Sequence, residues 1–159
     1  MKKLDEILGA IYRKDLAALA TFSPKDANAS DEDGRTALMH AVLADDADVA
    51  IVRLLIDRGA DVRAEDRNQK WTALHFAARD QNAAIVRCLL ENGAAVDPLD
   101  VFGNTPLWRG VMNATSSLDA IKELFAHGAD PEKKNRHGSA PIDVARQTGR
   151  DDILAVFSA

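Results

Sequence analysis

The sequence repeats itself at intervals of 33 to 36 residues, and this repetition limits the folds open to the chain. A segment that reads Thr-Ala-Leu, or a close variant of it, occurs at 36–38, 72–74, 105–107 and 140–142. A second marker, glycine followed by alanine, occurs at 59–60, 93–94 and 128–129. Two markers with one period indicate units that stack on their neighbours, because a unit of this length cannot bury its apolar face alone.

Each unit has the pattern of two helices followed by a turn. A threonine precedes the first helix, where its hydroxyl can accept from free backbone amides, and proline is tolerated in the first turn. The second helix is apolar at helical spacing over 51–55, 85–90 and 120–125. Gly59, Gly93 and Gly128 then occupy the position of a left-handed helix cap. Short segments rich in Asp, Asn and Gly follow and predict protruding turns.

These motifs resemble the ankyrin repeat family, whose signature is a Thr-Pro-Leu-His start, an apolar run and a Gly-Ala-Asp loop. Residues 72–95 match it best, with the glycine 93 − 72 = 21 positions after the threonine. The other two repeats carry two extra residues each, which we place at 44–48 and 113–117. The turn before Thr72 is one residue longer than its counterparts and has Lys70 at its usual glycine position.

The resemblance implies an all-α solenoid of stacked helix-turn-helix units with protruding β-hairpin-like turns. We predict a single domain over 1–159. Its parts are an N-terminal capping unit (1–34), three repeats (35–67, 68–101 and 102–134) and a C-terminal capping unit (135–159).

Composition argues against several classes of function. Twenty Lys and Arg against 25 Asp and Glu give a formal charge of −5, which disfavours general nucleic-acid binding. The single cysteine, Cys88, cannot form an intrachain disulfide and fits a reducing compartment. No segment has the pattern of a signal peptide or a membrane span. We therefore expect a cytoplasmic protein that binds neither nucleic acid nor membrane.

The residues that could carry chemistry are better explained by structure. The resemblance implies that His75 joins the turns of adjacent repeats by hydrogen bonds, and we expect His40 to be half-buried and Cys88 to lie in the core. Neither a phosphate loop nor a complete calcium loop is present, so we expect no cofactor and no metal. The alternative is an enzyme or small-ligand receptor that uses His40, His75 or Asp143.

In ankyrin stacks, partners usually contact the turn tips and the exposed face of each first helix, and this resemblance implies where a partner binds here. The predicted partner-binding residues are Asp33, Arg35, Lys70, Trp71, Arg79, Val101, Phe102, Asn104, Met112 and Arg136. Solvated tips are normally polar, so apolar side chains there indicate an interface hot spot. In the alternative, Trp71 and Phe102 pack on neighbouring turns.

The function that we predict is protein binding without enzymatic activity, by a monomer that holds one folded protein partner. Such a binder would be an inhibitor, an adaptor or an immunity protein that occludes a toxin. The acidic run over 26–48 would attract a basic partner, although such a run is also typical of a solvated face. A further alternative is a structural scaffold that uses the extra residues at 44–48 and 113–117 to contact a larger assembly.

Overall fold

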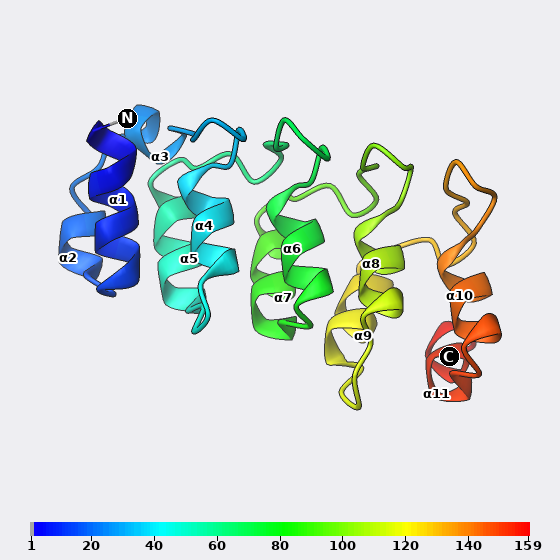
Figure 1. The fold of residues 1–159 in the computed structure, drawn as a ribbon. Coiled ribbons are helices and arrows are strands. Elements are labelled where there is room, and N and C mark those ends of the chain that lie inside the picture. Colours follow the sequence, from blue (N-terminus) through cyan, green and yellow to red (C-terminus); the bar gives the residue numbers. More distant parts are fainter. Residues whose placement is uncertain (1) are drawn as a thin grey trace. The chain divides into compact units, whose positions relative to one another are not determined.

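The computed structural model describes residues 2–159 and divides them into two compact units, Met1–Ala73 and Leu74–Ala159 (Figure 1). The first unit holds α1 (Lys2–Tyr12), α2 (Leu16–Leu19), α3 (Pro24–Ala27), α4 (Ala37–Leu43) and α5 (Val49–Asp57). The second holds α6 (Ala73–Arg79), which begins at the boundary, α7 (Ala83–Glu91), α8 (Pro106–Met112), α9 (Asp119–Ala126), α10 (Pro141–Gln147) and α11 (Asp151–Phe157). The predicted bounds of the capping units and repeats stay a prediction.

Within the first unit, α1 packs on α2, α3 and α4, while α5 packs on α4 and α2. Its core is aliphatic, and Ile7, Leu19, Leu38 and Leu55 are almost completely buried. Each of these residues lies on a different helix, so each short helix contributes a buried apolar side chain to the shared core. At about 25 cal/mol per Å² of apolar surface removed from water, this burial is the main stabilising contribution.

The second unit repeats the same arrangement with two layers of helices. The layer of first helices includes α8 and α10, and the layer of second helices includes α7, α9 and α11. Leu89, Leu107, Ile121 and Ile153 are fully buried between them. Gly110 on α8 lies close to its neighbours, but a Cβ there would be 3.6 Å from the Ala78 carbonyl oxygen, which is an ordinary van der Waals contact.

The predicted helix ends are confirmed. The Thr36 and Thr105 side chains accept hydrogen bonds from the amides of Met39 and Trp108, at 3.4 and 3.2 Å. Pro106 and Pro141 stand in the first turns of their helices. The glycines at 59, 93 and 128 have φ angles of 89°, 89° and 90°, a conformation that L side chains rarely adopt.

The predicted hairpin-like turns also form. The amides of Asp31, Asp100 and Asn135 donate to the carbonyl oxygens four residues later, at 3.0, 3.0 and 2.9 Å. In the longer turn the Asp66 amide donates instead to the Trp71 carbonyl, five residues later, at 2.9 Å. Lys70 there has a φ of 56°, whereas glycines occupy the equivalent positions 34, 103 and 138.

The architecture is therefore all-α, and the only strand-like pairing within residues 2–159 is an isolated bridge between Ser30 and Thr36. None of the helices in that range is both long and apolar enough to span a membrane.

Candidate protein-binding surfaces

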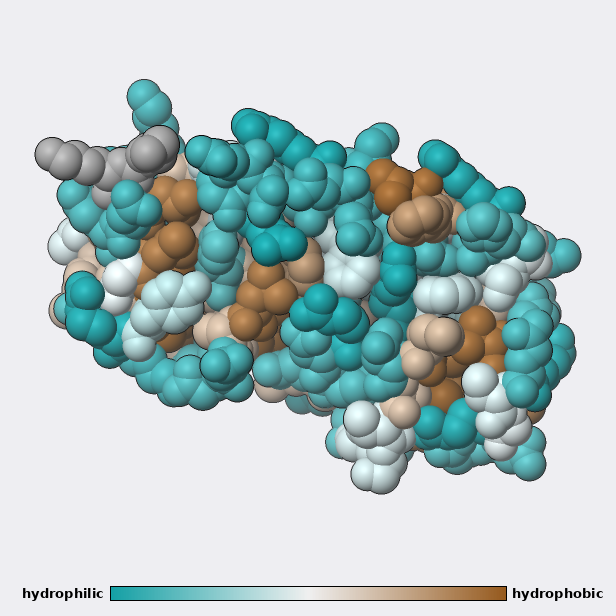
Figure 2. All heavy atoms as spheres, in the orientation of Figure 1, coloured by the Kyte–Doolittle hydropathy of each residue, from teal (hydrophilic) through white to brown (hydrophobic). Residues whose placement is uncertain are grey.

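The tip of the turn before α8 presents apolar side chains to solvent (Figure 2). Phe102 is 47% exposed, and Val101 beside it is partly exposed. The backbone beneath them is held on both sides: the Phe102 amide donates to Asp100 Oδ1 at 2.9 Å, and the Phe102 carbonyl accepts from the Arg136 amide at 3.0 Å. The aromatic ring is thus presented on a fixed backbone, which reduces the entropy lost when a partner binds.

An ion pair under this turn fixes it to α8. Arg109 donates from Nε to Asp100 Oδ2 at 3.1 Å and also contacts this oxygen through Nη2. Burial by itself raises the pKa of Asp100, but hydrogen bonds from Arg109 and from the amides of Asn104 and Phe102 outweigh it and hold the pKa below its ordinary value. Asp100 therefore remains a carboxylate that organises the tip.

Three further residues of this unit that were predicted to bind a partner differ in their exposure and in the contacts they already make. Met112, at the end of α8, is 58% exposed, and Arg136 is exposed at the tip of the next turn. Arg79 is half-buried, donates to both carboxylate oxygens of Asp80 at 2.7 and 3.0 Å, and lies 5.5 Å from the centre of the Phe76 ring. Met112 and Arg136 could meet a partner without giving up such contacts.

The exposure predicted for Asn104 is wrong, and of the two alternatives left open for Trp71 the structure shows the packed one. Trp71 is only 7% exposed and Asn104 only 4%. Both residues immediately precede the threonine that begins the next helix, and at that position the chain turns inward. The Asn104 amide donates to Asp100 Oδ1 at 2.9 Å, and its Oδ1 accepts from Asn135 Nδ2 at 2.7 Å. Of the two aromatic residues whose packing was left open, Trp71 packs inside and Phe102 remains in solvent.

In the first unit the predicted residues are polar. Asp33 is exposed and accepts at Oδ1 from Asn68 Nδ2, at 2.9 Å. The Asp33 carbonyl accepts from the Arg67 amide at 2.8 Å, which joins one turn to the next. Arg35 is half-buried and donates its amide to Asp31, while Lys70 is exposed. This part of the predicted surface offers charge and little apolar area.

The structural interpretation of the histidines and the cysteine is confirmed. His75 is fully buried, and its Nε2 lies 3.2 Å from the carbonyl oxygen of Asn104 in the next turn. His40 is half-buried, with its Nε2 2.8 Å from Asp31 Oδ2. Cys88 lies in the core at 1% exposure. No group of three His, Cys, Asp or Glu side chains suited to holding a metal is found in the described part of the chain.

Sequence reasoning missed the pairs that join each turn to its helix. Asp31 contacts His40, and Asp100 contacts Arg109; in both cases the partners are nine residues apart. This shared spacing, with an acidic residue in the turn and a basic residue on the helix, is the signal that would have revealed them. Leu99, which is 45% exposed, was also not predicted.

Short helix pairs joined by hairpin-like turns, repeated along the chain, define a repeat protein built from helix-turn-helix units. A family model described as ankyrin repeats (3 copies) matches residues 7–100 and 44–135. The chain belongs to the ankyrin repeat family. Ankyrin repeats are protein–protein interaction modules.

Relatives carry similar repeats inside longer proteins. The chain is 37% identical over 112 residues to serine/threonine-protein kinase 12 of Arabidopsis thaliana, which covers 70% of this chain and 22% of the kinase. It is 33% identical over 101 residues to NF-kappa-B inhibitor zeta of Homo sapiens, covering 60% of this chain and 14% of the inhibitor. A putative ankyrin repeat protein, FPV031 of fowlpox virus, is 30% identical over 111 residues, with coverage of 67% and 32%. The chain thus spans less than a third of each of these relatives.

Proposed function

We propose that the chain is a non-enzymatic binding protein that holds one folded protein partner, and that Phe102 is a main contact in its second unit. The observation that carries this proposal is the 47% exposure of Phe102 on a backbone held by Asp100 and Arg136. An aromatic ring in water loses the favourable free energy of burial, at about 25 cal/mol per Å² of apolar surface. A partner that covers Phe102, Val101 and Met112 recovers it.

The mode of action that we infer is occlusion: the bound partner is kept from another interaction. One relative bears the name of an inhibitor of NF-kappa-B, which supports inhibition by binding as a function of such repeats. Neutralising a basic toxin is one form of this proposal, and the formal charge of −5 favours a partner with a basic surface. The positions of the histidines support binding over catalysis, because His75 is fully buried and hydrogen-bonded to Asn104.

The test is capture of partners by the tagged full chain from cells of its own source, followed by mass spectrometry and measurement of the affinity for the captured protein. We expect Phe102→Ala to weaken binding by about 1 to 2 kcal/mol, or roughly five- to thirtyfold. Tyr12→Ala is the matched control, because Tyr12 is an aromatic residue of the first unit that is 63% exposed. Unchanged affinity in Phe102→Ala, with an unchanged circular dichroism spectrum, contradicts the proposal.

A structural scaffold is the second candidate, and one observation favours it. The extra residues after α8 are held in place, since Arg150 donates to the carbonyl oxygens of Ala114 and Thr115 at 3.1 and 2.9 Å. A loop fixed in this way can serve as a contact in a larger assembly. Crosslinks to a partner that map to 113–117, and not to 101–102, would support the scaffold.

A further inference from the structure

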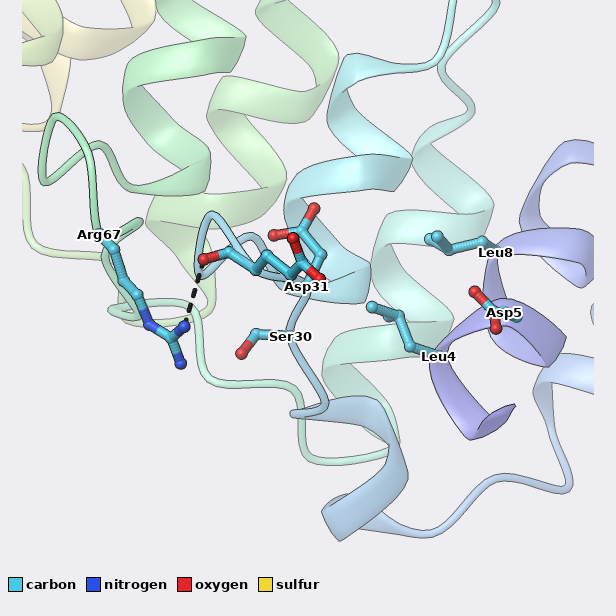
Figure 3. Close-up of a pocket in the computed structure, with 7 residues that line it drawn as sticks. Leu4, Asp5, Leu8, Ser30, Asp31 and Arg67 are labelled. Carbon is cyan, nitrogen blue, oxygen red and sulfur yellow. Dashed lines mark hydrogen bonds between the residues drawn. The ribbon is translucent and has the colours of Figure 1, made fainter. Parts of the chain in front are cut away.

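A groove in the first unit lies between α1 and the turn that precedes α4 (Figure 3). It has a volume of about 320 Å³, near the lower end for small-ligand sites, so one long side chain fits it better than a folded element does. The residues that line it are Leu4, Asp5, Leu8, Ser30, Asp31, Glu32 and Arg67.

One side of the groove is apolar. Leu4 and Leu8 stand one turn apart on α1, so both side chains lie on the same face of that helix. Figure 3 shows them on the side of α1 that faces Ser30 and Asp31. In Figure 2, apolar side chains reach the surface between α1 and α4, flanked by hydrophilic ones. An aliphatic chain laid along this side would lose contact with water.

The charged groups around the groove are mostly acidic. Asp5, Asp31 and Glu32 contribute carboxylates, and among the side chains that the structure describes, those from residue 3 onward, Arg67 is the only cation that lines it. The Arg67 guanidinium donates from Nη1 to the Glu32 carbonyl oxygen at 3.2 Å, so it is held at the turn and does not reach across to Asp5 (Figure 3). Asp31 is already bonded to His40 and to the Arg35 amide. Within the side chains that the structure describes, the Asp5 and Glu32 carboxylates form no ion pair.

We propose that this groove receives an arginine or lysine side chain of a protein partner, with its methylene groups against Leu8 and the small exposed edge of Leu4 and its cationic end at the acidic rim that Asp5 and Glu32 form. Long basic side chains have both parts that such a site needs, an apolar stem and a charged head that stays near water. Carboxylates on both elements, α1 and the turn, make the rim of the groove acidic and so favour a cationic side chain. The proposal rests on the proposed function, because it describes one contact of the same protein partner.

A titration followed by NMR tests the groove directly. The probe is a blocked pentapeptide with a central arginine flanked by leucines, added to the ¹⁵N-labelled full chain. The comparison peptide has citrulline in place of arginine, which keeps the shape and removes the charge. We expect the arginine peptide to shift the amide signals of Leu4, Leu8 and Ser30 to Glu32 in the millimolar range. The citrulline peptide should bind about three- to tenfold more weakly.

Two double variants with the same change in net charge distinguish binding in the groove from non-specific electrostatic attraction to an acidic protein. The double variant Asp5→Asn with Glu32→Gln removes the two carboxylates. It should weaken binding of the arginine peptide by about three- to tenfold, as citrulline does. Asp45→Asn with Asp57→Asn, at exposed positions outside the groove, should leave its binding unchanged. Equal binding of both peptides, equal effects of both double variants, or shifts centred on 45–48 would overturn the proposal. Such a result, with capture of a partner still dependent on Phe102, refutes the groove and leaves the proposed function standing.

Discussion

Asp97, in the turn between α7 and α8, offers a sharp test of how neighbouring repeats are joined. Its Oδ2 accepts from the Asp130 amide at 3.1 Å, but its buried Oδ1 has no hydrogen-bond partner in residues 2–159. Asn28 makes the same link in the first unit, where its Oδ1 accepts from the Asp61 amide at 2.7 Å and its Nδ2 donates to the Gly59 carbonyl at 2.7 Å. In both links the partners are 33 residues apart.

We predict that Asp97→Asn stabilises the protein. The new amide would donate to the carbonyl of Gly128, the residue equivalent to Gly59, and would remove an acceptor buried without a donor. A net hydrogen bond contributes about 0.5 to 1.5 kcal/mol, and an unsatisfied buried group costs about 1 to 3 kcal/mol. Since Asp97 is only half-buried, we expect a gain of about 1 to 2 kcal/mol at pH 7.

The gain should depend on pH. Burial raises the pKa of Asp97, against the opposing effects of the Asp130 amide and the Lys133 ammonium group. A carboxyl whose pKa is raised on folding binds protons more tightly in the folded state, so its contribution to stability is lost as the pH rises through that pKa. The loss of stability that the charged Asp97 carboxylate causes in the natural chain is therefore full at pH 7 and smaller at pH 4. The gain in stability from Asp97→Asn should shrink in the same direction.

Urea unfolding at pH 7 and pH 4, followed by circular dichroism, measures both effects, with the slope compared between variants to confirm that the same surface unfolds. Asn28→Asp is the reciprocal control and should lower stability at pH 7, by less because Asn28 is more exposed. If Asp97→Asn gives no gain in stability at pH 7, the inference that the unpaired Asp97 Oδ1 weakens the contact between these two turns is refuted. An equal gain at both pH values would refute the role of the charge.

Two further predictions concern the turn before α8. Gly103 and Gly138 have nearly equal φ angles, 77° and 78°, but a Cβ on Gly103 would lie 3.0 Å from the Arg136 amide nitrogen, whereas nothing lies within 4 Å of one on Gly138. Gly138→Ala should therefore lower the free energy of unfolding by about 1 to 2 kcal/mol through backbone strain. Gly103→Ala should lower it by about 1 to 3 kcal/mol more, because its Cβ also clashes with the Arg136 amide. Equal losses of stability on thermal unfolding would contradict this prediction. Asp100→Asn should lower stability at pH 7 by about 2 to 3 kcal/mol through the weakened contact with Arg109. Because the pKa of Asp100 is lowered, its contribution is present above the ordinary carboxyl pKa and is lost as the pH falls, so the variant should lose less stability on acidification than the natural chain does.

The repeat period and its local signals predicted most of the fold. Threonine caps, cap glycines and the extra residue before Thr72 are local features, and each acts within a few residues of its own position. The role of His75 followed from the family pattern, and the structure places its ring against the Asn104 carbonyl. Such features are predictable because the same backbone geometry recurs in every unit.

The candidate site was less predictable, because exposure depends on which way a turn residue points. Trp71 and Asn104 stand at the same position before the helix, and both are buried. Aligning Trp71 with Asn104, and not with the apolar tip of the next turn, would have indicated that its ring packs inside. The groove beside Leu4 and Leu8 could not be read from the chain, since it forms only where α1 meets a turn about 25 residues later.

The turns before α4 and α8 show where specificity can reside in this protein. Both close with a backbone hydrogen bond over four residues, and both use an aspartate that pairs with a basic side chain nine residues later. Their tips nevertheless differ, with Glu32 and Asp33 in the first and Val101 and Phe102 in the second. Because the side chains at the tips do not form the hydrogen bonds that close the turns, the fold constrains these positions weakly. Their chemistry is thus free to follow the partner, with one tip suited to a basic surface and the other to an apolar one.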